Sequence, residues 1–266
     1  MQKIMQPTSD KTSTYSFNAE FFEEDFTGAM SWGVLGKRIL RASAQHADDR
    51  NFEHVQCNGR TYLWVLSRMV IEMDRMPHTG DKGSITTWLT SVQRCFVGRC
   101  YVLRDEAGNV YGRVTSVWAL IDSESRNLVN PMDVIGEKLT GYVDADNAVD
   151  LGRCVRINTE GMQNAERRKV YCSDLDKNGH LNSIRYIDFA LDTFPKETFE
   201  TMRPCRVELA YNRESVCGDD MDIMYKQAKQ DSCDSEQPRG TVGQHLFALC
   251  RRGKVACTCA ITLCNK

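Results

Sequence analysis

One polar segment in the second half of the sequence combines side chains that could carry out acid–base chemistry. Asp176, Asn178 and His180 occupy alternate positions between a predicted strand and a predicted apolar helix. Alternate side chains of an extended chain point to the same side, so the segment predicts a carboxylate, an amide and an imidazole lying together. They offer a base, an orienting dipole and a proton carrier. The structural alternative is helix capping, which is the role predicted for Asn182.

A second carboxylate follows in the segment Tyr211-Asn212-Arg213-Glu214-Ser215. The patterns Asp-x-Asn-x-His-x-Asn-Ser-x-x-Tyr-Ile and Tyr-x-Arg-Glu, in this order, resemble the active-site signature of the acyl-ACP thioesterases. The first half is similar to the same family in several stretches, which are 64–68, 74–77, 80–81, 87–88 and 118–122, with Arg126 and Pro131 beyond them. The resemblance covers about 15–264, which is nearly the whole chain.

This resemblance implies a fold, an activity and a set of site residues. The fold would be α+β, a tandem double hotdog with two antiparallel sheets that each wrap a central helix. The activity would be hydrolysis of acyl-ACP thioesters to free fatty acid and acyl carrier protein (ACP), with no metal and no cofactor. The implied catalytic residues are Asp176, Asn178, His180 and Glu214, with Asn182 and Ser215 in supporting places.

The chemistry of a thioester suggests roles for these residues. Hydrolysis needs a placed water or carboxylate nucleophile and a group that stabilises the oxyanion. Asp176 or Glu214 would be the base or nucleophile, His180 would shuttle the proton at neutral pH, and Asn178 would orient the water or the carbonyl. Many members of the family carry cysteine where this chain has Ser215, so a thiolate mechanism is not expected here.

Two other classes of function remain open. One is another hotdog enzyme, either an acyl-CoA thioesterase or a hydroxyacyl-ACP dehydratase. A dehydratase would pair a histidine with a carboxylate across the two halves, whereas both groups lie in the second half of this sequence. The other is a non-catalytic module that binds an acyl thioester, and such a module would be expected to have lost the polar residues.

Composition limits the protein's class and partners. The 266 residues are 41% hydrophobic and 26% charged, which is typical of soluble globular proteins. The net charge of −2 gives no basic footprint for nucleic acid. The first 14 residues are polar and no run of 18 apolar residues occurs, so we expect a cytoplasmic protein without a membrane span. No transit-type extension precedes residue 15, which favours a bacterial member of the family.

The sequence contains 12 cysteines but no Cys-x-x-Cys pair, which disfavours a zinc ribbon. Cys257 and Cys259 share one face of a predicted strand with apolar residues, so they are interpreted as small core side chains. Without a secretory signal, nothing favours disulfides.

The chain divides into a tail (1–14), an N-terminal hotdog with the acyl pocket and a degenerate site (15–123), a linker (124–165) and a catalytic C-terminal hotdog (166–266). Periodicity predicts helices at 28–47, 183–192 and 195–202. It predicts strands at 15–21, 61–74, 82–94, 97–104 and 110–122, then at 167–173, 205–215, 220–229, 242–250 and 254–264. A polar loop is expected at 231–240.

The two halves show a faint internal repeat. Gly80-Asp81 corresponds to Gly218-Asp219, and 25–31 falls on 176–182. Thr27 and Ala29 would then occupy the positions of Asn178 and His180, with Met76 opposite Glu214. This pairing predicts a gene duplication in which one active site has survived.

The first half is therefore predicted to hold the acyl chain. Its candidate lining residues are Trp32, Trp64, Trp88 and Phe96, although such side chains also fill cores. Basic residues on or near the first helix could steer the acidic ACP, or they could simply form a solvated helix face; they are Lys37, Arg38, Arg41 and Arg50. The basic segments 167–169 and 251–252 are equally plausible docking charges. Because one chain supplies both hotdogs, a monomer would be complete, and a homodimer stays open.

Overall fold

The structure is a computed structural model that describes residues 11–228, 238 and 240–266. Its centre is one continuous antiparallel sheet with the strand order β1-β4-β5-β6-β3-β9-β12-β11-β10-β8. The strands of the first half are β1 (Thr12–Asn18), β2 (Val55–Cys57), β3 (Arg60–Met73), β4 (Lys82–Gln93), β5 (Phe96–Asp105), β6 (Val110–Asp122) and β7 (Leu128–Val129). Those of the second half are β8 (Gln163–Lys169), β9 (Met202–Tyr211), β10 (Asp220–Gln227), β11 (Thr241–Arg251) and β12 (Lys254–Asn265).

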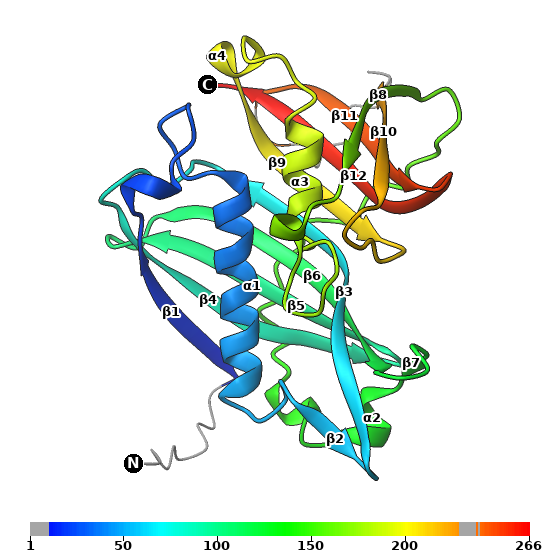
Figure 1. Ribbon diagram of the computed structural model, residues 1–266. Coiled ribbons are helices and arrows are strands. Elements are labelled where there is room, and N and C mark those ends of the chain that lie inside the picture. The colour runs from blue at the N-terminus through cyan, green and yellow to red at the C-terminus, as the bar shows by residue number, and fades with distance from the viewer. Residues whose placement is uncertain (1–10, 229–237, 239) are drawn as a thin grey trace.

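The two halves of the sheet have the same strand order. Counted within each half, the strands run 1-3-4-5-2, as β1-β4-β5-β6-β3 and as β8-β10-β11-β12-β9. The halves join where β3 pairs with β9, so the two predicted sheets form one surface (Figure 1). The α+β prediction is confirmed. The short strands β2 and β7 are additions that pair with β3 and β6.

Two helices lie on the same face of this sheet (Figure 1). They are α1 (Trp32–Asp48) in the first half and α3 (Arg185–Leu191) in the second, with the short α4 (Thr198–Thr201) after α3. The first helix starts four residues later than the predicted start at 28, because Ser31 is its N-cap and accepts the Val34 N–H at 3.3 Å. No helix in the described part of the chain is long and apolar enough to cross a membrane.

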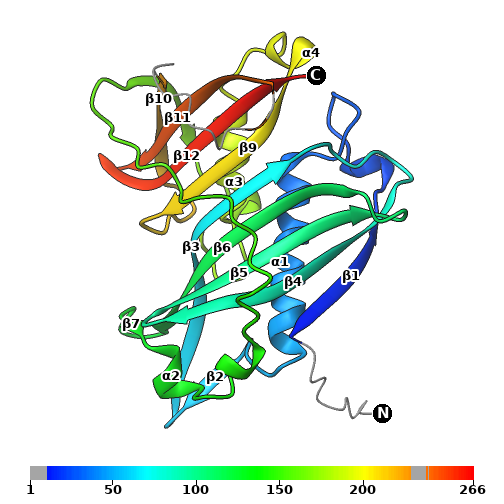
Figure 2. The ribbon, with the colours of Figure 1, turned by 180° about the vertical axis from the view of Figure 1, so that it is seen from behind.

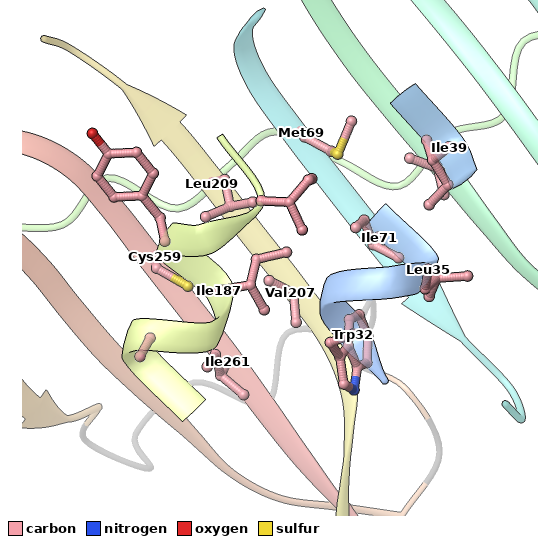
Figure 3. Packing of buried hydrophobic residues seen from close by; sticks show 14 of the residues in the cluster. Trp32, Leu35, Ile39, Met69, Ile71, Ile187, Val207, Leu209, Cys259 and Ile261 are labelled. Atoms are coloured by element: carbon pink, nitrogen blue, oxygen red, sulfur yellow. The ribbon is translucent and has the colours of Figure 1, made fainter. Parts of the chain in front are cut away.

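The hydrophobic core lies between these helices and the β3–β9 junction (Figure 3). Leu35 and Ile39 of α1 and Ile187 of α3 are at most 1% exposed. Below them, Met69 and Ile71 of β3 stand opposite Leu209 and Val207 of β9 in the pairing register, and all four are fully buried. One core therefore serves both halves of the chain.

The helices touch each other through two glycines of α1. A Cβ atom at Gly33 would lie 2.8 Å from an oxygen of Asp188, and one at Gly36 would lie 2.6 Å from Ile184. Ile184 is fully buried and immediately precedes α3. The absence of side chains at these two positions lets α3, and the loop before it, sit directly against α1.

The connection between the halves crosses the opposite face of the sheet (Figure 2). The predicted linker contains α2 (Pro131–Val134) and a single 3₁₀ turn (Thr140–Tyr142). Val143 then bridges to Leu89 of β4, and the Val155 N–H donates to the buried carboxylate of Glu208 at 2.7 Å. A connecting segment with only short helical turns therefore packs on the second face of the sheet.

The prediction for the cysteines is wrong at one pair. Cys205 of β9 and Cys264 of β12 form a disulfide, because these neighbouring strands pair almost in register at that point. Cys257 and Cys259 are buried free thiols, as predicted. Cys233 and nearly all of the predicted loop at 231–240 lie outside the described residues.

Candidate active site

The segment that carries Asp176, Asn178 and His180 forms a tight turn, so the prediction of an extended segment is wrong. Asp176 Oδ1 accepts the N–H groups of Asn178 at 2.8 Å and His180 at 3.1 Å. The Asp176 N–H donates to the His180 carbonyl at 2.7 Å. Gly179 adopts a φ of +78°, where only glycine is free of steric cost. The turn forms because an aspartate side chain bonds to the backbone N–H groups that follow it.

The first half contains the same turn. Asp25 Oδ1 accepts the Thr27 N–H at 2.8 Å, the Asp25 N–H donates to the Ala29 carbonyl at 2.9 Å, and Gly28 also has a φ of +78°. Thr27 and Ala29 thus occupy the positions of Asn178 and His180, as the internal repeat predicts.

The chain segment facing each turn is equivalent as well. The Leu181 N–H donates to the Ser215 carbonyl, and the Met30 N–H donates to the Pro77 carbonyl. The residues before these acceptors are Glu214 and Met76, so a methionine stands where the second half has its carboxylate. The first-half turn keeps the backbone geometry, including its own aspartate, but it lacks equivalents of the His180 imidazole and the Glu214 carboxylate.

The end of β9 brings Glu214 to the histidine. Glu214 Oε2 lies 3.4 Å from His180 Nε2, and the backbone of His180 forms an isolated bridge with Val216. The other carboxylate oxygen of Glu214 bonds to the guanidinium of Arg126, which lies in the turn that follows β6 of the first half. Arg251 donates to the Glu214 carbonyl at 3.0 Å. Sequence motifs alone predicted the Glu214 carboxylate and the His180 imidazole, but they did not predict Arg126 as the basic partner of the carboxylate.

These side chains line an open groove of about 770 Å³. Its polar wall holds the predicted quartet, which is Asp176, Asn178, His180 and Glu214. A second, mostly apolar cavity of about 250 Å³ lies next to it under the C-terminal half of α1. The two share five lining residues, which are Leu40, Trp64, Trp118, Lys177 and Asn178. The polar groove therefore continues into an apolar pocket of the first half.

The aromatic lining differs from the prediction. Trp64, a predicted lining residue, lines both cavities. Trp118 was not among the predicted lining residues, yet it lines both as well. Trp32 packs in the main core. Neither Trp88 nor Phe96 lines either cavity. Alternation along β3 and β6 could have assigned Trp64 and Trp118 to a sheet face, but not to the face that the pocket occupies.

The two supporting residues have structural roles. Ser215 is fully buried, and its hydroxyl accepts a hydrogen bond from the Tyr186 hydroxyl at 3.2 Å, outside the groove. Asn182 lines the groove, and its side-chain oxygen accepts the Ile184 N–H at 3.0 Å. The N-cap of α3 is Ile184, so the prediction of Asn182 as the N-cap is wrong by two residues, although its capping bond is present.

Two of the predicted docking charges are engaged elsewhere. Arg50 is only 2% exposed, so it cannot meet a partner protein. Arg38 pairs with Glu23 at 2.6 Å. Within the residues that the structure describes, no cluster of three histidine, cysteine, aspartate or glutamate side chains could hold a metal ion.

Burial raises the pKa of two tyrosines beside the site. Tyr186 and Tyr211 both line the groove, and desolvation is the largest cause that lifts each pKa above the ordinary value of 10.0. Both phenols are therefore neutral hydrogen-bond donors over the working range of most enzymes. The Tyr211 hydroxyl donates to the Ser183 carbonyl at 2.8 Å, which fixes the chain between the turn and α3.

The fold and this groove define a tandem double hotdog, with α1 and α3 as the helices packed on the two halves of the sheet and a polar site where the halves meet. Comparison with known proteins identifies the family. Residues 10–139 match the acyl-ACP thioesterase N-terminal domain, and residues 157–261 match the acyl-ACP thioesterase C-terminal domain. The chain belongs to the acyl-ACP thioesterase family.

Solved structures agree with this assignment. The chain is 32% identical to an acyl-ACP thioesterase from Bacteroides thetaiotaomicron, with a TM-score of 0.79 and coverage of 95% of this chain and 98% of that one. The 12:0-ACP thioesterase from Umbellularia californica has the same fold at 20% identity, with a TM-score of 0.74 over 97% of this chain and 95% of its own.

Curated relatives match only part of their own length. A chloroplastic acyl-[acyl-carrier-protein] hydrolase from Cuphea viscosissima is 29% identical over 220 residues, which are 78% of this chain and 52% of that protein. A second hydrolase from the same plant is 30% identical over 161 residues, or 58% and 39%. The chain therefore spans about half the length of the curated relatives it matches, or less.

Proposed function

We propose that this protein hydrolyses the thioester between a fatty acyl chain and ACP, releasing a free fatty acid. The observation that carries the proposal is the His180–Glu214 pair, 3.4 Å apart, in a groove that continues into an apolar pocket. An imidazole beside a carboxylate can take a proton from water and return it to a leaving group. The neighbouring pocket offers apolar surface to an acyl chain.

In the proposed mechanism, His180 takes a proton from a water molecule while Glu214 stabilises the imidazolium that forms. The water oxygen attacks the thioester carbonyl carbon, and Asn178 donates a hydrogen bond to the carbonyl oxygen as negative charge develops on it. The C–S bond then breaks, and the thiolate takes the proton from His180. Asp176 already accepts two backbone N–H groups through Oδ1, which supports a role in holding the turn.

We further propose that the first half, residues 15–123, houses the acyl chain, while 166–266 carries the reacting groups. The apolar pocket under α1 and the retained but unequipped turn at 25–29 support this division. A duplicated ancestor that lost one site explains both features. Because the site is complete within one chain, we propose a monomer as the active unit. The cytoplasmic location stays a prediction.

The decisive experiment compares steady-state hydrolysis of acyl-ACP and acyl-CoA of the same chain length by the wild-type protein and by Asp176→Ala, His180→Ala and Glu214→Gln. We expect turnover of acyl-ACP, with His180→Ala and Glu214→Gln lowering kcat by at least about 100-fold, the lower end of general acid–base catalysis. A retained kcat in His180→Ala would refute the mechanism. A preference for acyl-CoA would show that CoA, and not ACP, is the carrier of the substrate. Binding of acyl-ACP without turnover would identify a non-catalytic binding module.

A further inference from the structure

A basic side chain at the start of the linker, in the turn that follows β6 of the first half, reaches into the site of the second half. Arg126 bonds to one carboxylate oxygen of Glu214, although 88 positions separate them in the sequence. It sits in a tight turn after β6, in which Asp122 Oδ1 accepts the N–H groups of Glu124 at 3.1 Å and Ser125 at 2.8 Å. The Arg126 N–H donates to the Asp122 carbonyl at 3.0 Å. The base of this arginine is therefore fixed by its own half.

We infer that Arg126 is a positioning residue that holds the Glu214 carboxylate against His180. This inference rests on the proposed function. One carboxylate oxygen, Oε1, bonds to the guanidinium, while the other, Oε2, lies 3.4 Å from His180 Nε2. Because the two oxygens have different partners, the Glu214 side chain is held in one rotamer and Oε2 faces the imidazole ring. Without the arginine, the Glu214 side chain is free to leave the histidine.

The burial of these groups shows why a partner is needed. The Glu214 side chain is 44% exposed and the Arg126 side chain is 38% exposed, so no packed core fixes the carboxylate. An exposed glutamate otherwise samples several rotamers. The Arg251 guanidinium pairs with Asp219 at 2.6 Å and, within Glu214, donates to the backbone carbonyl. It therefore fixes the main chain of Glu214 and leaves the carboxylate to Arg126. The reacting pair thus depends on a residue from the half that lacks catalytic groups.

The test is acyl-ACP hydrolysis by Arg126→Met and Arg126→Lys, with Arg60→Met as the matched control. Arg60 pairs at 3.5 Å with Asp122 of the same turn, yet its side chain is 70% exposed and outside the groove. We expect Arg126→Met to lower kcat about tenfold, the effect of losing one partly screened charged hydrogen bond, with KM nearly unchanged. Arg126→Lys and added guanidinium ion restore part of kcat, and Arg60→Met has no effect.

Several outcomes would overturn the inference. One is a wild-type kcat in Arg126→Met, and another is a raised KM at constant kcat, which would make Arg126 a substrate-binding group. Equal losses in the methionine and lysine variants, with a lowered unfolding temperature and no guanidinium rescue, would show a structural role. Glu214→Gln separates the inference from the proposed function. If that variant is inactive while Arg126→Met is not, only the positioning role fails.

A pair of thiols beside the turn supports a second, independent inference. Cys172 Sγ and Cys217 Sγ lie 3.1 Å apart, and both residues are exposed. Cys172 begins the 3₁₀ turn that leads into the catalytic turn, and Cys217 follows Glu214 by three positions. By the hydrogen-bond equivalence of the halves, the first half has Phe21 and Thr79 at these places. The thiol pair is therefore confined to the half that carries the reacting groups.

We propose that Cys172 and Cys217 form a reversible disulfide that ties together the two segments of the site. The sulfur atoms need to approach by about 1 Å to reach the bond length of a disulfide. In the reaction, one cysteine thiolate attacks oxidised glutathione and releases one glutathione thiol. The second cysteine thiolate then attacks the mixed disulfide and releases the other. Two protein thiols and one glutathione disulfide thus give one protein disulfide and two glutathione thiols.

Mass spectrometry of the full chain after incubation with oxidised glutathione tests this proposal. We expect a peptide pair linked through Cys172 and Cys217, reversed by dithiothreitol, and a raised unfolding temperature because the cross-link restricts the unfolded chain. Cys217→Ser should give only a mixed disulfide at Cys172 and no rise. Mixed disulfides at both cysteines of the wild type, or no reaction at either, would overturn the proposal.

Discussion

Alanine substitutions at two equivalent glycines provide a direct test of whether one half of the protein performs the chemistry. Gly28 and Gly179 occupy the same place in their turns, and each has a φ of +78°. A Cβ atom added at either position would have no heavy atom within 4 Å beyond its chain neighbours. Gly28→Ala and Gly179→Ala therefore impose the same backbone strain without a steric clash. The matched pair separates loss of stability from loss of catalytic geometry.

The expected loss of stability is small and equal for the two variants. An L-residue in the left-handed region costs about 1–2 kcal/mol, and replacing glycine restricts the unfolded chain by about 0.4–1 kcal/mol. The unfolding free energy should fall by about 1 kcal/mol in each variant. The catalytic effects differ, because Gly179 precedes His180 and Gly28 precedes Ala29. A displacement of the imidazole by about 1 Å lowers kcat by about 100-fold, so we expect a 10- to 100-fold loss in Gly179→Ala only.

Urea unfolding gives the two stabilities, and steady-state hydrolysis of acyl-ACP gives the two kcat values. The reasoning predicts overlapping unfolding curves and a wild-type kcat for Gly28→Ala. An equal loss of kcat in both variants would refute it, since the first-half turn would then also take part in catalysis. A large difference in stability would show that the two turns are not equivalent.

Three further changes probe the surroundings of the site. Gly36→Ala would place a Cβ 2.6 Å from the buried Ile184. Because alanine also favours the helix, the unfolding free energy measured in urea should fall by only about 1–2 kcal/mol. An unchanged unfolding free energy would contradict the α1–α3 contact. Burial is the largest cause that lowers the pKa of His46 from 6.5 to about 2, so below pH 6.5 the unfolded chain binds a proton that the folded chain does not. Stability should be full above pH 6.5 and about 2 kcal/mol lower at pH 5 from this group, a loss that His46→Gln should reduce. Ser215→Ala removes a buried partner of Tyr186, which should lower stability by about 1 kcal/mol and leave kcat nearly intact; an inactive variant would point to a serine nucleophile.

The parts of the site that follow from local interactions could be predicted from the sequence. An aspartate, a glycine and the spacing between them suffice to form each turn, because the bonds join residues at most four positions apart. This is why 25–31 and 176–182 could be aligned without a structure. The same locality explains the error at Asp176. Alternating residue types suggested an extended chain, but the carboxylate of Asp176 competes for the backbone N–H groups and bends the chain instead.

Long-range pairing could not be predicted in the same way, and it decides how the two halves make one site. Alternation along β3 and β9 shows that Met69, Ile71, Val207 and Leu209 face a core, but it does not show that these two strands are neighbours. The strands β6, β3 and β9 lie side by side. Both β6 and β9 run antiparallel to β3. The two strands therefore run in the same direction, and both end toward the N-terminal end of β3.

Arg126 follows the end of β6 by four positions, and Glu214 follows the end of β9 by three. The register of β3 against β9 therefore sets the distance between the guanidinium and the carboxylate. A slip of one residue would move them by about 3.4 Å and turn the buried side chains of β9 to the wrong face. The burial of the shared core thus fixes the register, and the register places an arginine of one half beside the reacting pair of the other.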